Sequence, residues 1–160
     1  ADLQIEYSLV TGGIEAAILP ACRELGIVIT AYGVLSRGLI SGHWSKQRNT
    51  DGRDFRTHSP RFQGANLDHN LALVEQLRAI AESRGASTAQ LAIAWVLARG
   101  DDIVPLVGAR TRKRLQEALG SLDITLGAEE LEAIERAVPP GAAAGERYSA
   151  QGMASLDSER

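Results

Sequence analysis

The residues best suited to chemistry lie at 108–114, where the sequence reads GARTRKR. Four cations therefore crowd the first turn of an expected helix. A helix N-terminus already carries about half a positive charge, so each added Arg or Lys costs roughly 0.3 to 1 kcal/mol unless an anion compensates. Backbone N–H groups, Gly108 and the planar guanidinium groups of Arg110 and Arg114 suit a phosphate. The alternative is a solvated basic face with Glu117 as an ionic partner.

Tyr32 is a second candidate, because it ends an expected strand and a glycine-containing turn follows it. Parallel α/β folds bind their ligands at the carboxyl ends of strands. The aromatic ring could stack on a flat ligand ring, or it could cap the end of the sheet without a ligand. Gly33, Gly38 and Gly42 would let backbone amides approach a second phosphate.

The elements that must position these residues alternate between strands and helices. A strand is expected at 3–9, a helix at 14–25, and a second strand at 27–31 whose lack of a polar face predicts burial on both sides. The further expected elements are a long loop at 42–64, a helix from Leu67 that ends before Gly85, a helix that begins at a capping box of Ser87 and Gln90, a strand at 103–107, and helices at 111–119 and 127–138. This order predicts parallel β-α units that either curl into a barrel or stack as an open sheet.

The composition predicts one folded domain, or a piece of a larger one, spanning residues 1–160. Hydrophobic residues make up 44% and charged residues 23%, as in ordinary globular proteins. The net charge of -3 argues against a nucleic-acid binder. The single Cys22 cannot form an internal disulfide, and we see no signal peptide, membrane-spanning run or metal-ligand spacing. We therefore expect a cytoplasmic protein without a membrane partner.

Several segments, in order, resemble the C-terminal part of the aldo-keto reductases, a family of (β/α)8 barrels that bind NADP(H) without a Rossmann domain. Residues 4–9 look like the family's sixth strand, and residues 32–38, YGVLSRG, look like the Tyr-Ser-Pro-Leu-Gly-x-Gly motif after the seventh. Residues 59–62, 92–97 and 104–117 also fall in family order. The resemblance covers nearly the whole chain and implies an α/β fold, a partial (β/α)8 TIM barrel with roughly strands 6 to 8 and their helices.

The resemblance also implies roles for individual residues toward NADP(H). Tyr32 would stack on the nicotinamide, and Gln4 would hydrogen-bond near its carboxamide. The residues expected to follow the pyrophosphate are Gly33, Val34, Leu35, Ser36 and Arg37, and His43 stands where relatives often place a Lys near the phosphates. The residues expected at the adenosine end are Gly108, Arg110 and Arg114 for the 2′-phosphate and Glu117 and Ala118 toward the adenine.

Departures from the family pattern fall inside these motifs. Gly33 and Val34 replace Ser and Pro, which removes a hydroxyl contact and some stiffness. Ala118 replaces the usual Asn, which removes an amide able to recognise adenine. Gly12 stands where relatives commonly carry Arg. None of these changes removes the expected 2′-phosphate site.

The family reduces carbonyls with a Tyr general acid supported by Lys, Asp and His, all from strands before the sixth. Lys46 and Lys113 do not look placed to lower the pKa of Tyr7, Tyr32 or Tyr148, so we name no catalytic residue. We predict the NADP(H)-binding C-terminal half of an oxidoreductase that reduces aldehydes or ketones. The alternatives are a non-catalytic cofactor-binding regulatory module, as in the channel β subunits of this fold, and an inactive truncated product.

Three parallel strands are too few to close a barrel, so strand edges and apolar faces would be exposed. We therefore expect the chain to self-associate or to pair with the missing half of the barrel.

Overall fold

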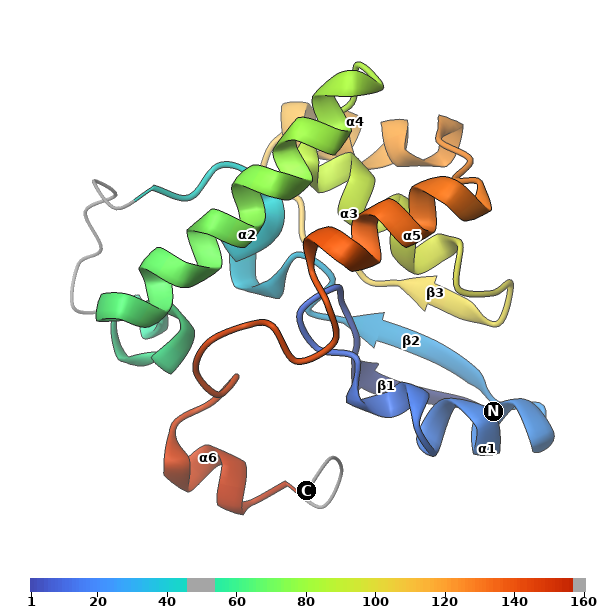
Figure 1. The fold of residues 1–160 in the computed structure, drawn as a ribbon. Helices are drawn as coiled ribbons and strands as arrows, with labels where there is room; N and C mark the ends of the chain where they lie inside the picture. Colours follow the sequence, from blue (N-terminus) through green and yellow to red (C-terminus); the bar gives the residue numbers. More distant parts are fainter. Residues whose placement is uncertain (46–53, 157–160) are drawn as a thin grey trace.

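The computed structural model describes residues 1–45 and 54–156. Its centre is a parallel sheet of three strands in the order β1 (Asp2–Glu6), β2 (Val28–Tyr32) and β3 (Ile103–Pro105). In the strand register Glu6 pairs with Tyr32, and Ala31 pairs with Pro105. The predicted set of three parallel strands is confirmed (Figure 1). The first strand is shorter than expected, because the chain turns after Glu6 and Ser8 pairs with Thr11.

The two faces of the sheet differ in their exposure. On one face Ile5, Ile29, Ala31 and Ile103 are buried, where α1 contacts β2 and α3 contacts β3. The side chains of the other face are exposed or half-buried, apart from the buried Glu6 at the end of β1. We call this the open sheet face; its exposed and half-buried residues are Asp2, Gln4, Val28, Thr30, Val104 and Leu106. The prediction that the strand at 27–31 is buried on both sides is therefore wrong. Val28 is 38% exposed because no described element covers it.

The helices begin and end close to the local sequence signals. The expected helix at 14–25 is divided into a 3-10 turn, η1 (Gly13–Glu15), and α1 (Ile18–Glu24). The two long helices are α2 (Gly64–Ser83) and α3 (Thr88–Leu97). Gly85 adopts a positive φ of 65° just after α2, as its predicted capping role requires. The capping box of α3 is also confirmed, because Ser87 Oγ accepts from the Gln90 N–H at 3.2 Å and Gln90 Oε1 accepts from the Ser87 N–H at 2.8 Å.

The remaining elements surround this frame. The helices toward the C-terminus are α4 (Arg112–Leu119), α5 (Ala128–Ala137) and α6 (Ala150–Ala154), with the 3-10 turn η5 (Gly120–Asp123) between the first two. The segment expected to be a long loop contains η3 (Phe55–His58) and η4 (Pro60–Phe62), and η2 (Ser36–Ser41) precedes it. None of the described helices is both long enough and apolar enough to span a lipid bilayer.

Candidate functional site

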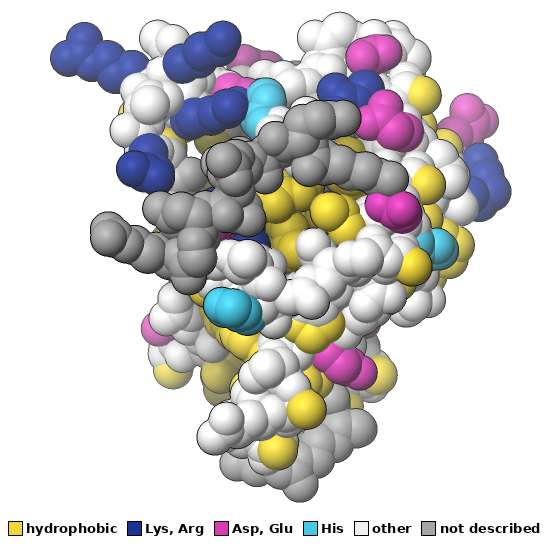
Figure 2. Space-filling model, turned by 90° about the vertical axis from the view of Figure 1, so that its left-hand side faces the viewer, with side chains coloured by type: hydrophobic (Ala, Val, Ile, Leu, Met, Phe, Trp, Pro, Cys, Tyr) yellow, Lys and Arg dark blue, Asp and Glu magenta, His cyan; other side chains and the backbone are white. Residues whose placement is uncertain are grey.

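A cavity of about 730 Å³ opens where β2 and β3 end. Four parts of the chain form its walls: the turn after β2 with η2, the start of α3, the segment 106–111, and α4. All of the predicted site residues line it except Gln4 and Ser36; those that do are Tyr32, Gly33, Val34, Leu35, Arg37, His43, Gly108, Arg110, Arg114, Glu117 and Ala118. Figure 2 shows Lys and Arg side chains gathered at the upper left, beside a hollow with hydrophobic side chains at its base.

The turn after β2 has a backbone shape that the sequence specifies at Gly33. This residue has a φ of 69°, and a Cβ built on it would lie 3.0 Å from Glu6 Cγ. Both the positive φ and the close contact favour glycine. Ser36 and Arg37 also have positive φ values, 44° and 57°, although neither is glycine. Such conformations cost energy and are typical of sites where the backbone itself meets a ligand.

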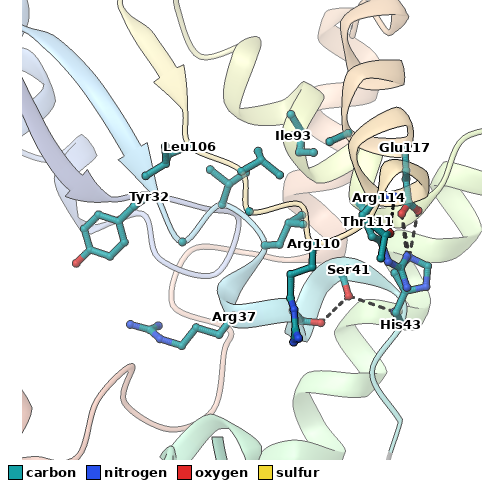
Figure 3. Close-up of a pocket in the computed structure, with 18 residues that line it drawn as sticks. Tyr32, Arg37, Ser41, His43, Ile93, Leu106, Arg110, Thr111, Arg114 and Glu117 are labelled. Carbon is teal, nitrogen blue, oxygen red and sulfur yellow. Dashed lines mark hydrogen bonds and ion pairs between the residues drawn. The ribbon is translucent and has the colours of Figure 1, made fainter. Parts of the chain in front are cut away.

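The Arg37 guanidinium forms an ion pair with the carboxylate of Glu6. It donates to both oxygens of Glu6, at 3.2 and 3.1 Å, and lies 4.6 Å from the centroid of the Tyr148 ring. Glu6 is fully buried. In Figure 3 the Arg37 side chain points toward Tyr32 and away from the basic start of α4. A ligand phosphate beside this turn would therefore meet the backbone of Arg37 rather than an unpaired guanidinium.

Tyr32 lies at one end of the cavity with its hydroxyl 3.2 Å from that of Tyr148. Burial, the contact with Tyr148 and the charge of Glu6 raise the pKa of Tyr32 from 10.0 to about 12. Burial and a hydrogen bond to Glu15 likewise raise the pKa of Tyr7. No lysine is among the causes of these two shifts within the described residues, and the expectation for Lys46 stays a prediction. Lys113 is exposed at the start of α4, and Lys46 lies outside the described residues.

The basic segment forms the other end of the cavity. Thr111 caps α4 by accepting from the Arg114 N–H at 3.3 Å. Arg114 Nη1 donates to Glu117 Oε2 at 2.9 Å, and His43 Nε2 lies 3.1 and 3.2 Å from the two oxygens of the same carboxylate. Figure 3 shows these three side chains together beside Thr111. Within the described part of the chain, Arg110 makes no hydrogen bond or ion pair.

Glu117 is ionised in this arrangement. Burial raises the pKa of its carboxyl, but hydrogen bonds from Arg114, Ser87 and His43 outweigh that effect, and the net pKa lies below its ordinary value. The carboxylate therefore neutralises part of the charge at the helix start. The sequence offered Glu117 as an ionic partner of the basic segment, and the structure shows this pairing for Arg114. Arg110 has no such partner among the described residues, so its charge at the cavity is uncompensated.

Two predicted residues lie away from the cavity. Gln4 is exposed on the open sheet face and pairs with Thr30, two residues before Tyr32 on that face. Ser36 is buried, and its Oγ lies 3.5 Å from Arg61 Nη1. The sequence reasoning assigned no role to six residues that line the cavity: Ser41, Ala89, Ile93, Leu106, Val107 and Thr111. Only Thr111 could have been identified from its neighbours, as a capping residue before a helix. The others line the cavity because of how the chain packs in the folded structure.

The arrangement suits an elongated anionic ligand with an aromatic group at one end. Tyr32 supplies a ring, Ile93 and Leu106 supply apolar wall, and Gly108 with Arg110 supplies an anion site at the start of α4. Among residues 1–45 and 54–156, no three His, Cys, Asp or Glu side chains gather in a group that could hold a metal ion.

Comparisons with known proteins give consistent matches. A family model described as "Aldo/keto reductase family" matches residues 1–139. The chain is 42% identical over 146 residues to a probable aldo-keto reductase 1 from Glycine max, covering 91% of this chain and 42% of that protein. It is 35% identical over 161 residues to aldo-keto reductase str7 from Strobilurus tenacellus, covering 99% of this chain and 48% of that protein.

A solved structure gives the same picture. A glycerol dehydrogenase from Gluconobacter oxydans matches with a TM-score of 0.80 and 31% identity, covering 86% of this chain and 42% of that chain. The three parallel strands and their helices are thus part of a (β/α)8 barrel. The chain spans less than half the length of these relatives.

Proposed function

The chain belongs to the aldo/keto reductase family, and from this premise we propose that it is the NADP(H)-binding, C-terminal half of an oxidoreductase that reduces aldehydes or ketones. Its strands then correspond to strands 6 to 8 of the barrel. Aldo-keto reductases typically use NADP(H). The observation that carries the proposal is that one cavity contains both Tyr32 and the basic start of α4.

The described residues fit the two ends of such a cofactor. Arg110 has an uncompensated charge beside the backbone of Gly108, which suits the 2′-phosphate, and Arg114 would turn from Glu117 to the same group. Tyr32 offers its ring to the nicotinamide. The backbone of the turn from Gly33 to Arg37 would follow the pyrophosphate, while His43, Glu117 and Ala118 would lie toward the adenosine. When bound, the cofactor supplies the hydride that reduces a carbonyl carbon.

A calorimetric titration with NADPH and NADH tests the proposal. We expect NADPH to bind more tightly, and Arg110→Ala to remove the preference by weakening NADPH about tenfold, since one hydrogen bond to a charged group is worth about 1.5 kcal/mol or more. Arg112→Ala is the matched control, because Arg112 lies at the same helix start but does not line the cavity. Equal affinity for the two nucleotides, or binding of neither, would contradict the proposal.

A cofactor-binding module without catalysis is the second candidate. It is favoured by the raised pKa of Tyr7 and of Tyr32, since a general acid needs a pKa nearer to neutrality. An aldehyde-reduction assay with NADPH on the 160-residue chain, alone and mixed with the missing half of the barrel, separates the two candidates. Turnover by the mixture supports the oxidoreductase half, and binding without turnover in the mixture supports the module. Turnover by the isolated chain would show that an acid-base set is present in this chain, contrary to our assignment of no catalytic residue. Binding without turnover agrees with that assignment.

A further inference from the structure

The carboxylate of Glu117 lies between two basic side chains of the cavity wall. Arg114 Nη1 donates to Glu117 Oε2 at 2.9 Å, and His43 Nε2 lies 3.1 and 3.2 Å from the two carboxylate oxygens. All three residues line the cavity, and their side chains meet beside Thr111 (Figure 3). In the empty cavity, Glu117 therefore holds an arginine that the proposed function assigns to a ligand phosphate.

This carboxylate is charged and only partly screened by solvent. The Glu117 side chain is 18% exposed. Burial raises the pKa of its carboxyl, but hydrogen bonds from Arg114, Ser87 and His43 outweigh this effect and leave the pKa below its ordinary value. Glu117 is therefore an anion at neutral pH, and it lies where a second anion is expected to bind.

A phosphate bound at this end of the cavity would meet that anion. Arg110 lines the cavity without an ionic partner in the described chain, so it can donate to a phosphate directly. Arg114 can donate to the same phosphate only by leaving Glu117 or by sharing its donors between the two anions. In either case the charge of Glu117 opposes the phosphate, because like charges repel.

His43 can offset this repulsion. A neutral imidazole donates to Glu117 when its hydrogen is on Nε2, and a second proton on Nδ1 adds a positive charge without breaking that contact. A protonated His43 would stabilise the carboxylate after Arg114 has turned to the phosphate. The same charge would attract the phosphate itself.

Few other charged side chains in the described chain face His43. The elements packed around it contribute Glu117 and Arg114 from α4, Arg110 from the segment before α4, and Arg78 and Glu75 from α2. Arg78 donates to the carbonyl of the residue before His43 at 3.1 Å, and its own charge is paired with Glu75 at 3.1 Å. Within the described residues, Glu117 is thus the carboxylate that contacts the imidazole.

On the premise of the proposed function, we propose that Glu117 and the 2′-phosphate of NADP(H) compete for Arg114, and that His43 takes up a proton from solvent when the phosphate binds. Glu117 then limits the preference for NADPH over NADH, which carries no 2′-phosphate. Because the bound state holds the additional proton, NADPH affinity rises as the pH falls through the range in which histidines titrate, around pH 6.5, and this gain is absent at much higher pH.

Replacement of Glu117 tests the competition. In a calorimetric titration, Glu117→Gln should bind NADPH about fivefold more tightly than the wild type, because the amide removes the competing charge at nearly the same size. NADH affinity should stay the same. Glu75→Gln is the matched control, since Glu75 also pairs with an arginine three residues along its helix but does not line the cavity. Weaker or unchanged NADPH binding to Glu117→Gln would overturn the proposal.

Replacement of His43 tests the proton uptake. Between about pH 8.5 and about pH 6.5, the wild type should gain about threefold more NADPH affinity than His43→Gln. The ligand phosphate also titrates, with a pKa of about 6, but it does so with both proteins, so their ratio reports on His43. His58→Gln is the control, because His58 is exposed and does not line the cavity, and it should behave as the wild type.

Protons can also be counted directly. Calorimetry at neutral pH in two buffers of different ionisation enthalpy should show that the wild type takes up a larger fraction of a proton with NADPH than His43→Gln does. Equal uptake by the two proteins would overturn the proposal.

The outcomes separate this inference from the proposed function. NADPH binding that exceeds NADH binding but has the same pH dependence in the wild type and in His43→Gln would overturn the inference alone. Absence of NADPH binding at both pH values would overturn the proposed function and the inference together.

Discussion

Glu117 shows how one side chain decides between two interpretations of a motif. The basic segment at 108–114 could hold a phosphate or form a solvated face, and its sequence favours neither. In the structure the two arginines of this segment differ. Arg114 pairs with Glu117, which His43 also contacts, whereas Arg110 has no ionic partner in the described chain. The charge available to an anion is therefore concentrated at Arg110, the residue whose replacement should best report on nucleotide selectivity.

Tyr32 gives a prediction about alkaline pH. Its pKa is raised from 10.0 to about 12 in the folded chain, mainly by burial, so the folded state holds the phenolic proton more tightly than the unfolded state does. This contribution to stability is fully present below pH 10 and is lost as the pH rises through about 12. Between these values, the free energy of unfolding should fall more steeply for the wild type than for Tyr32→Phe.

Urea unfolding followed by circular dichroism at a series of pH values measures this difference. Tyr7 also has a raised pKa, but it is present in both proteins, so the difference between them reports on Tyr32 together with its contact to Tyr148. Parallel pH curves for the two proteins would contradict the assigned shift.

At the scale of elements, the turn after β2 sets the position of the site, and Gly33 fixes its shape. Gly33→Ala should destabilise the chain for two reasons, the positive φ of 69° and a contact of 3.0 Å between the new Cβ and Glu6 Cγ. A left-handed conformation alone costs about 1 to 2 kcal/mol for a residue other than glycine. We therefore expect a loss of more than about 2 kcal/mol in the free energy of unfolding.

Gly26→Ala is the control for this prediction. Gly26 has a nearly equal φ of 64°, but nothing lies within 4 Å of a Cβ built there. Its loss should thus reflect the backbone conformation alone, about 1 to 2 kcal/mol. Equal losses for the two variants in urea unfolding would mean that Glu6 moves aside without cost, and that the turn is less rigid than its geometry indicates.

At the scale of the whole molecule, the open sheet face is the most unusual feature. Val28, Val104 and Leu106 are 38%, 52% and 51% exposed, although strands of a barrel normally bury such side chains. The chain also spans less than half the length of its relatives. The expectation that the chain self-associates or pairs with another half of the barrel therefore remains a prediction, now with a defined surface.

Val104→Lys should reduce self-association, because it places a charge among the exposed apolar side chains of the open sheet face, where Val104 is 52% exposed. Light scattering over a range of protein concentrations measures the effect. Leu25→Lys is the control, since Leu25 is 71% exposed but follows α1 rather than lying on the open sheet face. A monomeric wild type, or the same decrease in both variants, would contradict this prediction.

The sequence by itself determined the features that depend on neighbours along the chain. The capping box at Ser87, the glycine after α2, the three parallel strands and the order of the family motifs were all predicted, because each follows from residues a few positions apart. Most residues of the cavity were named from the resemblance to the family. Only Tyr32, the glycines after it and the basic segment at 108–114 also followed from local residues, since strand ends in a parallel sheet meet at one edge.

Only the tertiary structure decided which side chains meet across long separations. His43 and Glu117 are 74 positions apart and Tyr32 and Tyr148 are 116 apart, so no local pattern could pair them. The same holds for Arg37 and Arg147 at the buried Glu6, which the sequence presents as ordinary surface cations. Burial depends on which distant residues the folded chain brings together, so only the structure shows which charged side chains lie in the interior.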